Sequence, residues 1–205
     1  MKKELEDNQA FNPICYTGLK VVLRPLNIET DLEACWKWIN DPEVNRYLLA
    51  TPPISLQEER KFFEKVSQRN SDSVCFGIET LDERRFIGTV GISSIRPIER
   101  IGSTGSLIGE KDCWSKGYGT DAKMLLLNHA FNTINLSKVN SSVTQFNERS
   151  AAALKKQGYV QEGIVRQDIF REGQYWDRIV FGLLKSEFEP LWAEYQEKLE
   201  ASKKA

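Results

Sequence analysis

The sequence predicts a single α/β (α+β) domain around a mixed, mostly antiparallel sheet. Three β-rich stretches, 74–80, 86–95 and 105–110, follow one another through short turn-like links, which is typical of antiparallel hairpins. A glycine-bearing loop at 114–120 then leads into an apolar helix, and a final pair of strands precedes a last helix. Strands and helices therefore share one domain, in the order β-α-α-β-β-β-loop-α-β-α-β-β, with no internal repeat.

The first third of the chain predicts one strand and two helices. We expect residues 1–16 to form a flexible segment, and the alternation of apolar and polar residues at 19–26 predicts a half-buried strand. Two capping boxes, 30–33 (Thr-Asp-Leu-Glu) and 55–58 (Ser-Leu-Gln-Glu), predict helix starts, and the second helix should reach about residue 68. The apolar face of the first helix comprises Leu32, Cys35, Trp36 and Ile39, with Trp38 off that face.

After the glycine loop, the pattern predicts a helix over 119–134 and a strand over 138–146. Asn147 caps the next helix, which ends at Gly158 as a left-handed stop residue. The last strands, 159–166 and 177–184, are joined by a hairpin turn at 171–174.

A final helix over 187–201 places apolar side chains on one side, namely Phe188, Leu191, Trp192, Tyr195 and Leu199. We expect this face to dock on its own domain, and a homodimer interface is the alternative.

Bulk composition excludes several classes of protein. The 205 residues are 40% hydrophobic and 28% charged, with a formal net charge of -1, so nothing attracts the chain to nucleic acid or to an anionic membrane. No apolar run approaches the roughly 20 residues that span a bilayer, and the start lacks a secretory signal. The four cysteines are scattered and there is one histidine, so we expect a cytoplasmic protein without a metal site.

The loop Trp114-Ser115-Lys116-Gly117-Tyr118-Gly119-Thr120 predicts a diphosphate site. Two glycines allow a sharp turn and leave no Cβ between the backbone and a ligand. Free N–H groups at the start of the following helix, together with its dipole, favour an anion. A glycine-rich turn that binds nothing is the alternative.

Two nucleotide-binding motifs fit the loop poorly. The dinucleotide fingerprint requires an acidic residue about 20 positions further on, and residues 122–147 contain no Asp or Glu. The mononucleotide P-loop places its lysine after the second glycine, whereas Lys116 precedes Gly117.

From about residue 107 to 184, the chain resembles the GNAT superfamily of acyl-CoA N-acyltransferases. Gly117 and Gly119 match the small positions of the family motif Q/R-x-x-G-x-G/A, and Trp114 stands at the Q/R position, as in the RimJ/RimL-like branch that acetylates protein N-termini. The branch is also indicated by Asn147-Glu148-Arg149-Ser150, Gly158-Tyr159, Glu162-Gly163 and Asn40-Asp41-Pro42-Glu43-Val44.

The resemblance implies a GNAT domain at 17–185, with a sheet of about seven strands, followed by a C-terminal helix and tail at 186–205. It also implies acetyl-CoA as co-substrate. The implied cofactor-binding residues are Leu107, Ile108, Gly109, Trp114, Ser115, Lys116, Gly117, Tyr118, Gly119, Thr120, Asn147 and Ser150. For Asn147 a pure N-cap role is the alternative, and both roles can hold together.

The family transfers the acetyl group by direct attack of an amine, without an acyl-enzyme. Many members use a Tyr as the acid for the departing thiolate, and Leu154 occupies that position here. The resemblance implies Ser150 as the substitute, against a capping role alone. Glu110 and Asp168 are the candidate general bases, with plain surface carboxylates as the alternative.

The sequence offers no strong candidate for a general base, and this favours an acceptor amine that loses its proton easily. At neutral pH, deprotonating a lysine-type amine costs roughly 4–5 kcal/mol, and an α-amine only about 1 kcal/mol. The expected acceptor is therefore a protein N-terminus or a small-molecule amine, with polyamines, antibiotics and amino sugars left open. A catalytically weak acyl-CoA-binding regulatory module is the alternative from another class, and a nucleotide-linked oxidoreductase is a third.

Overall fold

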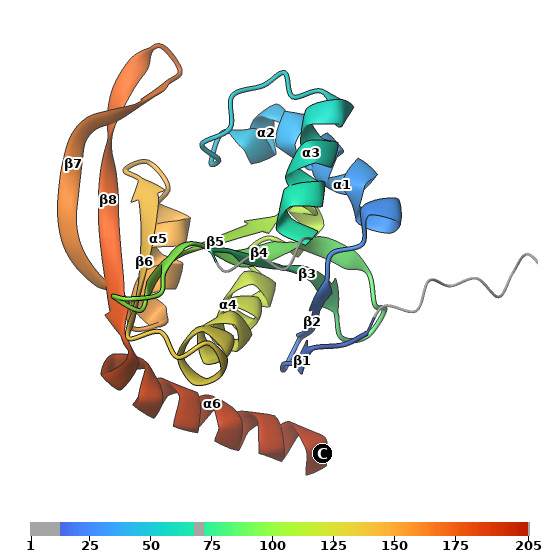
Figure 1. The fold of residues 1–205 in the computed structure, drawn as a ribbon, viewed down its shortest axis with the longest axis vertical. Helices are drawn as coiled ribbons and strands as arrows, with labels where there is room; N and C mark the ends of the chain where they lie inside the picture. Colours follow the sequence, from blue (N-terminus) through green and yellow to red (C-terminus); the bar gives the residue numbers. More distant parts are fainter. Residues whose placement is uncertain (1–12, 68–71, 205) are drawn as a thin grey trace, which may run out of the picture.

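The computed structural model describes residues 13–67 and 72–204 as one eight-stranded sheet with helices on both faces (Figure 1). The strands are β1 Tyr16–Thr17, β2 Val21–Pro25, β3 Val74–Thr80, β4 Phe86–Arg96, β5 Ile101–Ile108, β6 Lys138–Thr144, β7 Val160–Arg171 and β8 Gln174–Leu184. The helices are α1 Ile28–Asn40, α2 Pro42–Asn45, α3 Leu56–Ser67, α4 Tyr118–Asn128, α5 Glu148–Lys156 and α6 Lys185–Lys204. Short helical turns occupy Lys111–Cys113 and His129–Thr133.

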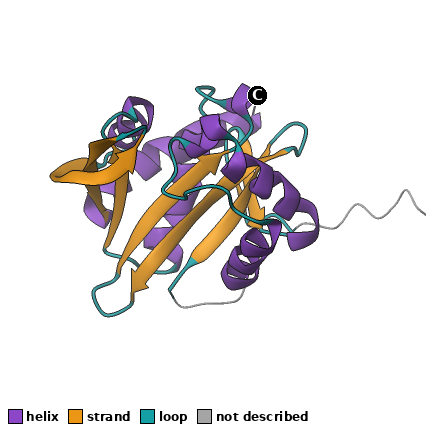
Figure 2. Cartoon of the chain, turned by 90° about the horizontal axis from the view of Figure 1, so that it is seen from above, coloured by secondary structure: helices purple, strands orange, loops and turns teal. Residues whose placement is uncertain are grey.

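The strand order is β1-β2-β3-β4-β5-β6-β8-β7, and every neighbouring pair is antiparallel except β5 and β6. The mixed, mostly antiparallel sheet is therefore confirmed, with β1 as an additional short edge strand. Helices α1, α2 and α3 lie over one face, and α4 and α6 lie under the other (Figures 1 and 2). The predicted flexible segment at 1–16 falls largely outside the described residues.

The first helix begins earlier than its sequence pattern predicts. Asn27 is the N-cap, accepting from Glu29 N at 2.9 Å, so the predicted capping box at 30–33 is wrong. Asp31 instead turns inward and binds the guanidinium of Arg24 on β2 at 2.6 and 2.8 Å. Trp38, two helical turns after Asp31 on the same side of α1, is buried as well, contrary to the prediction.

The second capping box is confirmed. Ser55 N donates to Glu58 Oε2 at 2.9 Å, and Glu58 N donates to Ser55 Oγ at 3.2 Å, which is the reciprocal pattern of such a box. Helix α3 follows directly. Gly158 also has the predicted left-handed conformation, with φ of 85°.

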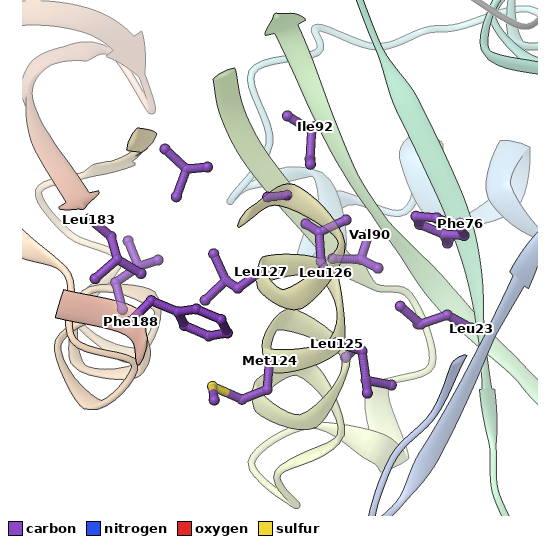
Figure 3. Close-up of a cluster of buried hydrophobic side chains, with 14 of the residues drawn as sticks. Leu23, Phe76, Val90, Ile92, Met124, Leu125, Leu126, Leu127, Leu183 and Phe188 are labelled. Atoms are coloured by element: carbon purple, nitrogen blue, oxygen red, sulfur yellow. The ribbon is translucent and has the colours of Figure 1, made fainter. Parts of the chain in front are cut away.

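Helix α4 forms the centre of the core. Its residues Met124 to Leu127 are all buried, and Figure 3 shows them between the sheet and Phe188 of α6. Phe188 and Tyr195 of α6 are buried in the same cluster, which confirms that this face docks on its own domain. No helix within 13–67 and 72–204 combines the length and the apolar character that crossing a bilayer requires.

Asp121, in the first turn of α4, joins three parts of the fold. Its carboxylate accepts from Lys20 N at 2.8 Å, Val21 N at 3.0 Å and Tyr195 Oη at 2.7 Å. Burial, with the neighbouring carboxylate, raises the pKa of Tyr195, which keeps its hydroxyl a donor. Asp121 therefore fixes β2 and α6 against the start of the glycine-loop helix.

We expect Asp121→Asn to lower the free energy of unfolding by about 3 kcal/mol, because an amide nitrogen would then face backbone donors inside the core. Urea denaturation of both proteins measures this. A loss below about 0.5 kcal/mol would show that the carboxylate does not hold these elements together.

Candidate active site

The parallel strands β5 and β6 pair at only three positions, from Ile101 opposite Lys138 to Ser103 opposite Asn140, and then separate. Where this backbone pairing ends, side-chain hydrogen bonds link the two strands. Thr104 Oγ1 donates to Asn140 O at 3.2 Å, and Ser141 Oγ donates to Thr104 O at 3.1 Å. A cavity of about 590 Å³ opens from this gap toward the glycine loop and toward α2 and α3.

The end of β5 presents alternate backbone groups to this gap. Gly109 N donates to Ile87 O on β4 at 2.9 Å, so it faces away from the gap. Because strand N–H and C=O groups alternate in direction, those of Ser106 and Ile108 face the gap. Ser106 lines the cavity and was not among the predicted residues. Gly109, which was predicted to bind the cofactor, does not line it.

The glycine loop has the conformation that an anion site requires. Gly117 is the N-cap of α4, with φ of 89°. The N–H groups of the first turn have no acceptor within the helix and carry the positive end of its dipole. Trp114 Nε1 donates to Ile108 O at 2.7 Å, which ties the loop to β5.

The structure divides the predicted loop residues into two groups. Those that line the cavity are Trp114, Ser115, Gly117, Gly119 and Thr120, and those that do not are Lys116 and Tyr118. A cation from another element lies here as well, since Lys20 Nζ donates to Lys116 O at 2.8 Å. Lys20 lies about a hundred residues away in sequence, and no sequence signal indicated its role.

Asn147 both caps α5 and presents a side-chain amide at the cavity. Its Oδ1 accepts from Ser150 N at 3.2 Å and caps α5, which confirms the cap. The Nδ2 amide has no acceptor among the described residues, and Asn147 lines the cavity. Ser150 lines it too, and its hydroxyl has no partner within the described parts of the chain. Leu154, at the position of the family's Tyr, also lies against the cavity.

The far wall of the cavity is apolar and aromatic. It is formed by Val44, Tyr47, Leu48, Leu49, Phe62 and Val66. The guanidinium of Arg149 lies 5.3 Å from the Tyr47 ring centroid and 4.4 Å from that of Trp114, so it joins this wall to the glycine loop. Arg149 was not predicted, although it stands inside the Asn147–Ser150 motif.

Neither predicted base lines the cavity. Glu110 lies two residues beyond β5 and accepts from Trp38 Nε1 at 3.0 Å. Asp168 on β7 is paired with Arg178 Nε at 2.5 Å. Among the described residues, the ionic side chains that line the cavity are Lys123, Arg149 and Arg178, and none is a carboxylate. The described lining therefore contributes no carboxylate of its own.

Comparisons with known proteins agree with this geometry. Residues 20–160 match the family described as Acetyltransferase (GNAT) domain. The chain is 26% identical over 171 residues to an uncharacterized N-acetyltransferase, p20, of Bacillus licheniformis, covering 82% of this chain and 95% of that protein. It is 28% identical over 167 residues to a spermidine N(1)-acetyltransferase of Escherichia coli K12, covering 78% and 83%.

A solved structure has the same fold. Spermidine N-acetyltransferase from Vibrio cholerae, in complex with CoA and spermine, superposes with a TM-score of 0.76 at 23% identity, over 82% of this chain and 98% of that chain. The loop geometry, the separated parallel pair and the match over most of the chain lead to one assignment. The chain is an N-acetyltransferase that belongs to the GNAT family, in its RimJ/RimL-like branch.

Proposed function

We propose that the protein transfers the acetyl group of acetyl-CoA to the α-amine of a protein N-terminus or of a small molecule, by direct attack in a ternary complex. The observation that carries this proposal is the continuous cavity that runs through the β5–β6 gap. It joins a diphosphate-binding helix start to an apolar wall that can hold a second substrate. The GNAT family uses acetyl-CoA, and the Vibrio cholerae relative was solved with CoA.

In this proposal the diphosphate of CoA lies on the N–H groups of Gly117 to Thr120. The pantetheine arm follows the backbone groups of Ser106 and Ile108, and a pantetheine carbonyl accepts from Asn147 Nδ2. These contacts hold the thioester in the gap, where an amine that enters along the Tyr47 wall can reach it. Positioning of two substrates supplies much of the rate enhancement.

The chemical step needs few protein groups. The unprotonated amine attacks the thioester carbonyl carbon, and N–H groups at the end of β5 stabilise the oxyanion. When the tetrahedral intermediate breaks down, the C–S bond cleaves and the amide forms. The CoA thiolate leaves with a hydrogen bond from Ser150 Oγ, and the proton lost by the amine finally protonates the thiolate.

Ser150→Ala tests the role of this hydroxyl. We expect kcat to fall by about 100-fold, with the KM for acetyl-CoA nearly unchanged, because the lost bond acts on the leaving group. The cap is made by Asn147 and the backbone N–H of Ser150, so the melting temperature should stay the same. A drop in stability with unchanged kcat would reduce Ser150 to a structural residue. Ser150→Thr, which keeps a hydroxyl, is the matched control.

The charge of the cavity favours an α-amine over a polyamine. A polyamine carries several positive charges, and the described residues that line the cavity include no carboxylate to pair with them. An α-amine with a pKa near 8 needs only about 1 kcal/mol to lose its proton at neutral pH, so it can react without a strong base. The absence of Glu110 and Asp168 from the described lining residues supports the same choice.

Release of free thiol from acetyl-CoA tests the acceptor. The panel contains a peptide with a free N-terminus and no lysine, the same peptide with a blocked N-terminus and one lysine, and spermidine. We expect the free N-terminus to give a kcat/KM at least tenfold above that of the other two. Preferential turnover of spermidine would contradict the proposal and would match the named activity of the Escherichia coli relative.

A further inference from the structure

Lys123 on α4 is a buried cation that the proposed mechanism does not use. Its side chain is only 3% exposed, yet it lines the cavity. Within residues 13–67 and 72–204 it forms no hydrogen bond and no ion pair. A charged group taken out of water without a partner is costly, and buried lysines are normally paired. A free ammonium group at the edge of a cavity therefore indicates a partner that comes with the ligand.

Helix geometry places this side chain beside the glycine loop. Lys123 follows Gly119 by four residues and Thr120 by three, so the three share one face of α4. Helical side chains lean toward the N-terminus of their helix, which directs Lys123 toward the turn made by Gly119 and Thr120. Both of these residues line the cavity. The amine is thus on the side of the free loop amides.

We propose that Lys123 is a further anion-binding residue, whose ammonium group pairs with the diphosphate of CoA and which takes up a proton when CoA binds. This inference rests on the proposed use of acetyl-CoA. Lys123 lies outside the Gly-x-Gly motif, so it adds a side-chain charge to a site otherwise built from backbone amides.

The protonation behaviour of the free protein supports this proton uptake. Burial lowers the pKa of Lys123 to about 7. An amine with that value is about half neutral at pH 7, whereas an ordinary lysine is neutral in only about one molecule in 2,500. A phosphate beside it favours the charged form and raises the pKa again. CoA binding is therefore tightest below pH 7 and weakens as the pH rises above it.

The other groups around Lys123 come from several elements. The elements that pack against it contribute neutral Thr104, Ser141, Leu154 and Gln157 to the cavity. Of the titratable groups in the lining, burial raises the pKa of Cys75 to about 12 and also raises that of Cys113. The remaining ionisable lining groups are Tyr47, Arg149 and Arg178. Next to Lys123 on α4, Asp121 is held by β2 and Tyr195.

Calorimetry of CoA binding in two buffers with different ionisation enthalpies measures the proton uptake. Relative to Lys123→Met, the wild-type protein should take up about 0.5 more protons at pH 7 and about 0.9 more at pH 8. Between pH 7 and pH 9, the Kd of the wild-type protein for CoA should rise by a factor at least tenfold larger than the factor by which the Kd of Lys123→Met rises. Methionine keeps the length and suits a buried helix position.

Lys123→Arg is the matched charged variant, and thermal melting verifies that each variant is folded. An arginine stays protonated, so this variant should bind CoA with no lysine-linked uptake and with a Kd that does not depend on pH in this range. Equal proton uptake in wild type and Lys123→Met, with CoA bound by both, would overturn this inference alone. No binding of CoA by the wild-type protein would overturn the proposed co-substrate as well.

Discussion

Replacement of Gly117 by aspartate is expected to weaken CoA binding by about 100-fold (about 2.7 kcal/mol) or more, while the protein remains folded. The new carboxylate would lie where the diphosphate is expected, so two anions would compete for the same N–H groups. The new Cβ would also lie 3.5 Å from Lys20 Nζ, which lets the carboxylate neutralise that cation. Aspartate is among the residues that tolerate a positive φ best, so the loop can still form.

Calorimetry with CoA, together with thermal melting, measures both parts of this prediction. Gly173→Asp is the matched control, because Gly173 also has a positive φ, of 77°, but lies in the β7–β8 turn with nothing within 4 Å of its Cβ position. It should lose a similar amount of stability and bind CoA normally. Wild-type affinity in Gly117→Asp would remove the glycine loop from the site.

Gly109→Ala should destabilise the protein by about 3 kcal/mol, for a reason unrelated to the cofactor. A Cβ at this position would lie 1.9 Å from Trp38 Cδ2, and the Gly109 backbone is fixed by its bond to Ile87 O. Either the indole or the end of β5 must move. Since Trp38 holds Glu110 and β5 presents Ile108 to the cavity, we also expect weaker CoA binding.

A double-mutant cycle with Trp38→Leu tests this explanation by urea denaturation. Leucine vacates the space that the Cβ would enter, so the two substitutions together should cost at least about 1.5 kcal/mol less than the sum of the single losses. Strictly additive losses would mean that Gly109 is required for some reason other than its contact with Trp38.

Features that depend on a few neighbouring residues could be predicted. The Ser55 capping box, the Asn147 cap, the Gly158 stop and the bounds of β3 are all observed where the pattern placed them. The loop before α4 belongs with these, since a positive φ at Gly117 and free helix-start amides follow from local sequence alone. The same local information identified the family.

The capping-box error occurred where a distant partner overrode a local pattern. Thr30 to Glu33 has the form of a capping box, but Arg24 draws Asp31 into the core and the helix starts at Asn27 instead. Gly109 lies outside the described lining of the cavity, and its closeness to Trp38 of α1 accounts for a glycine at this position. Neither the Arg24–Asp31 contact nor the Gly109–Trp38 contact can be inferred from the residues that neighbour it in the sequence.

The amino-acid sequence by itself determined the order of most elements, several of their boundaries and the glycine loop before α4, because hydrogen bonds between residues a few positions apart decide most of those features. Only the tertiary structure decided which side chains share the cavity. It brought Lys20 to the loop, set Arg149 against Tyr47, placed Lys123 at the gap, and left Glu110 and Asp168 outside the described lining. Contacts between residues about a hundred positions apart depend on how the elements pack, and no local pattern encodes that.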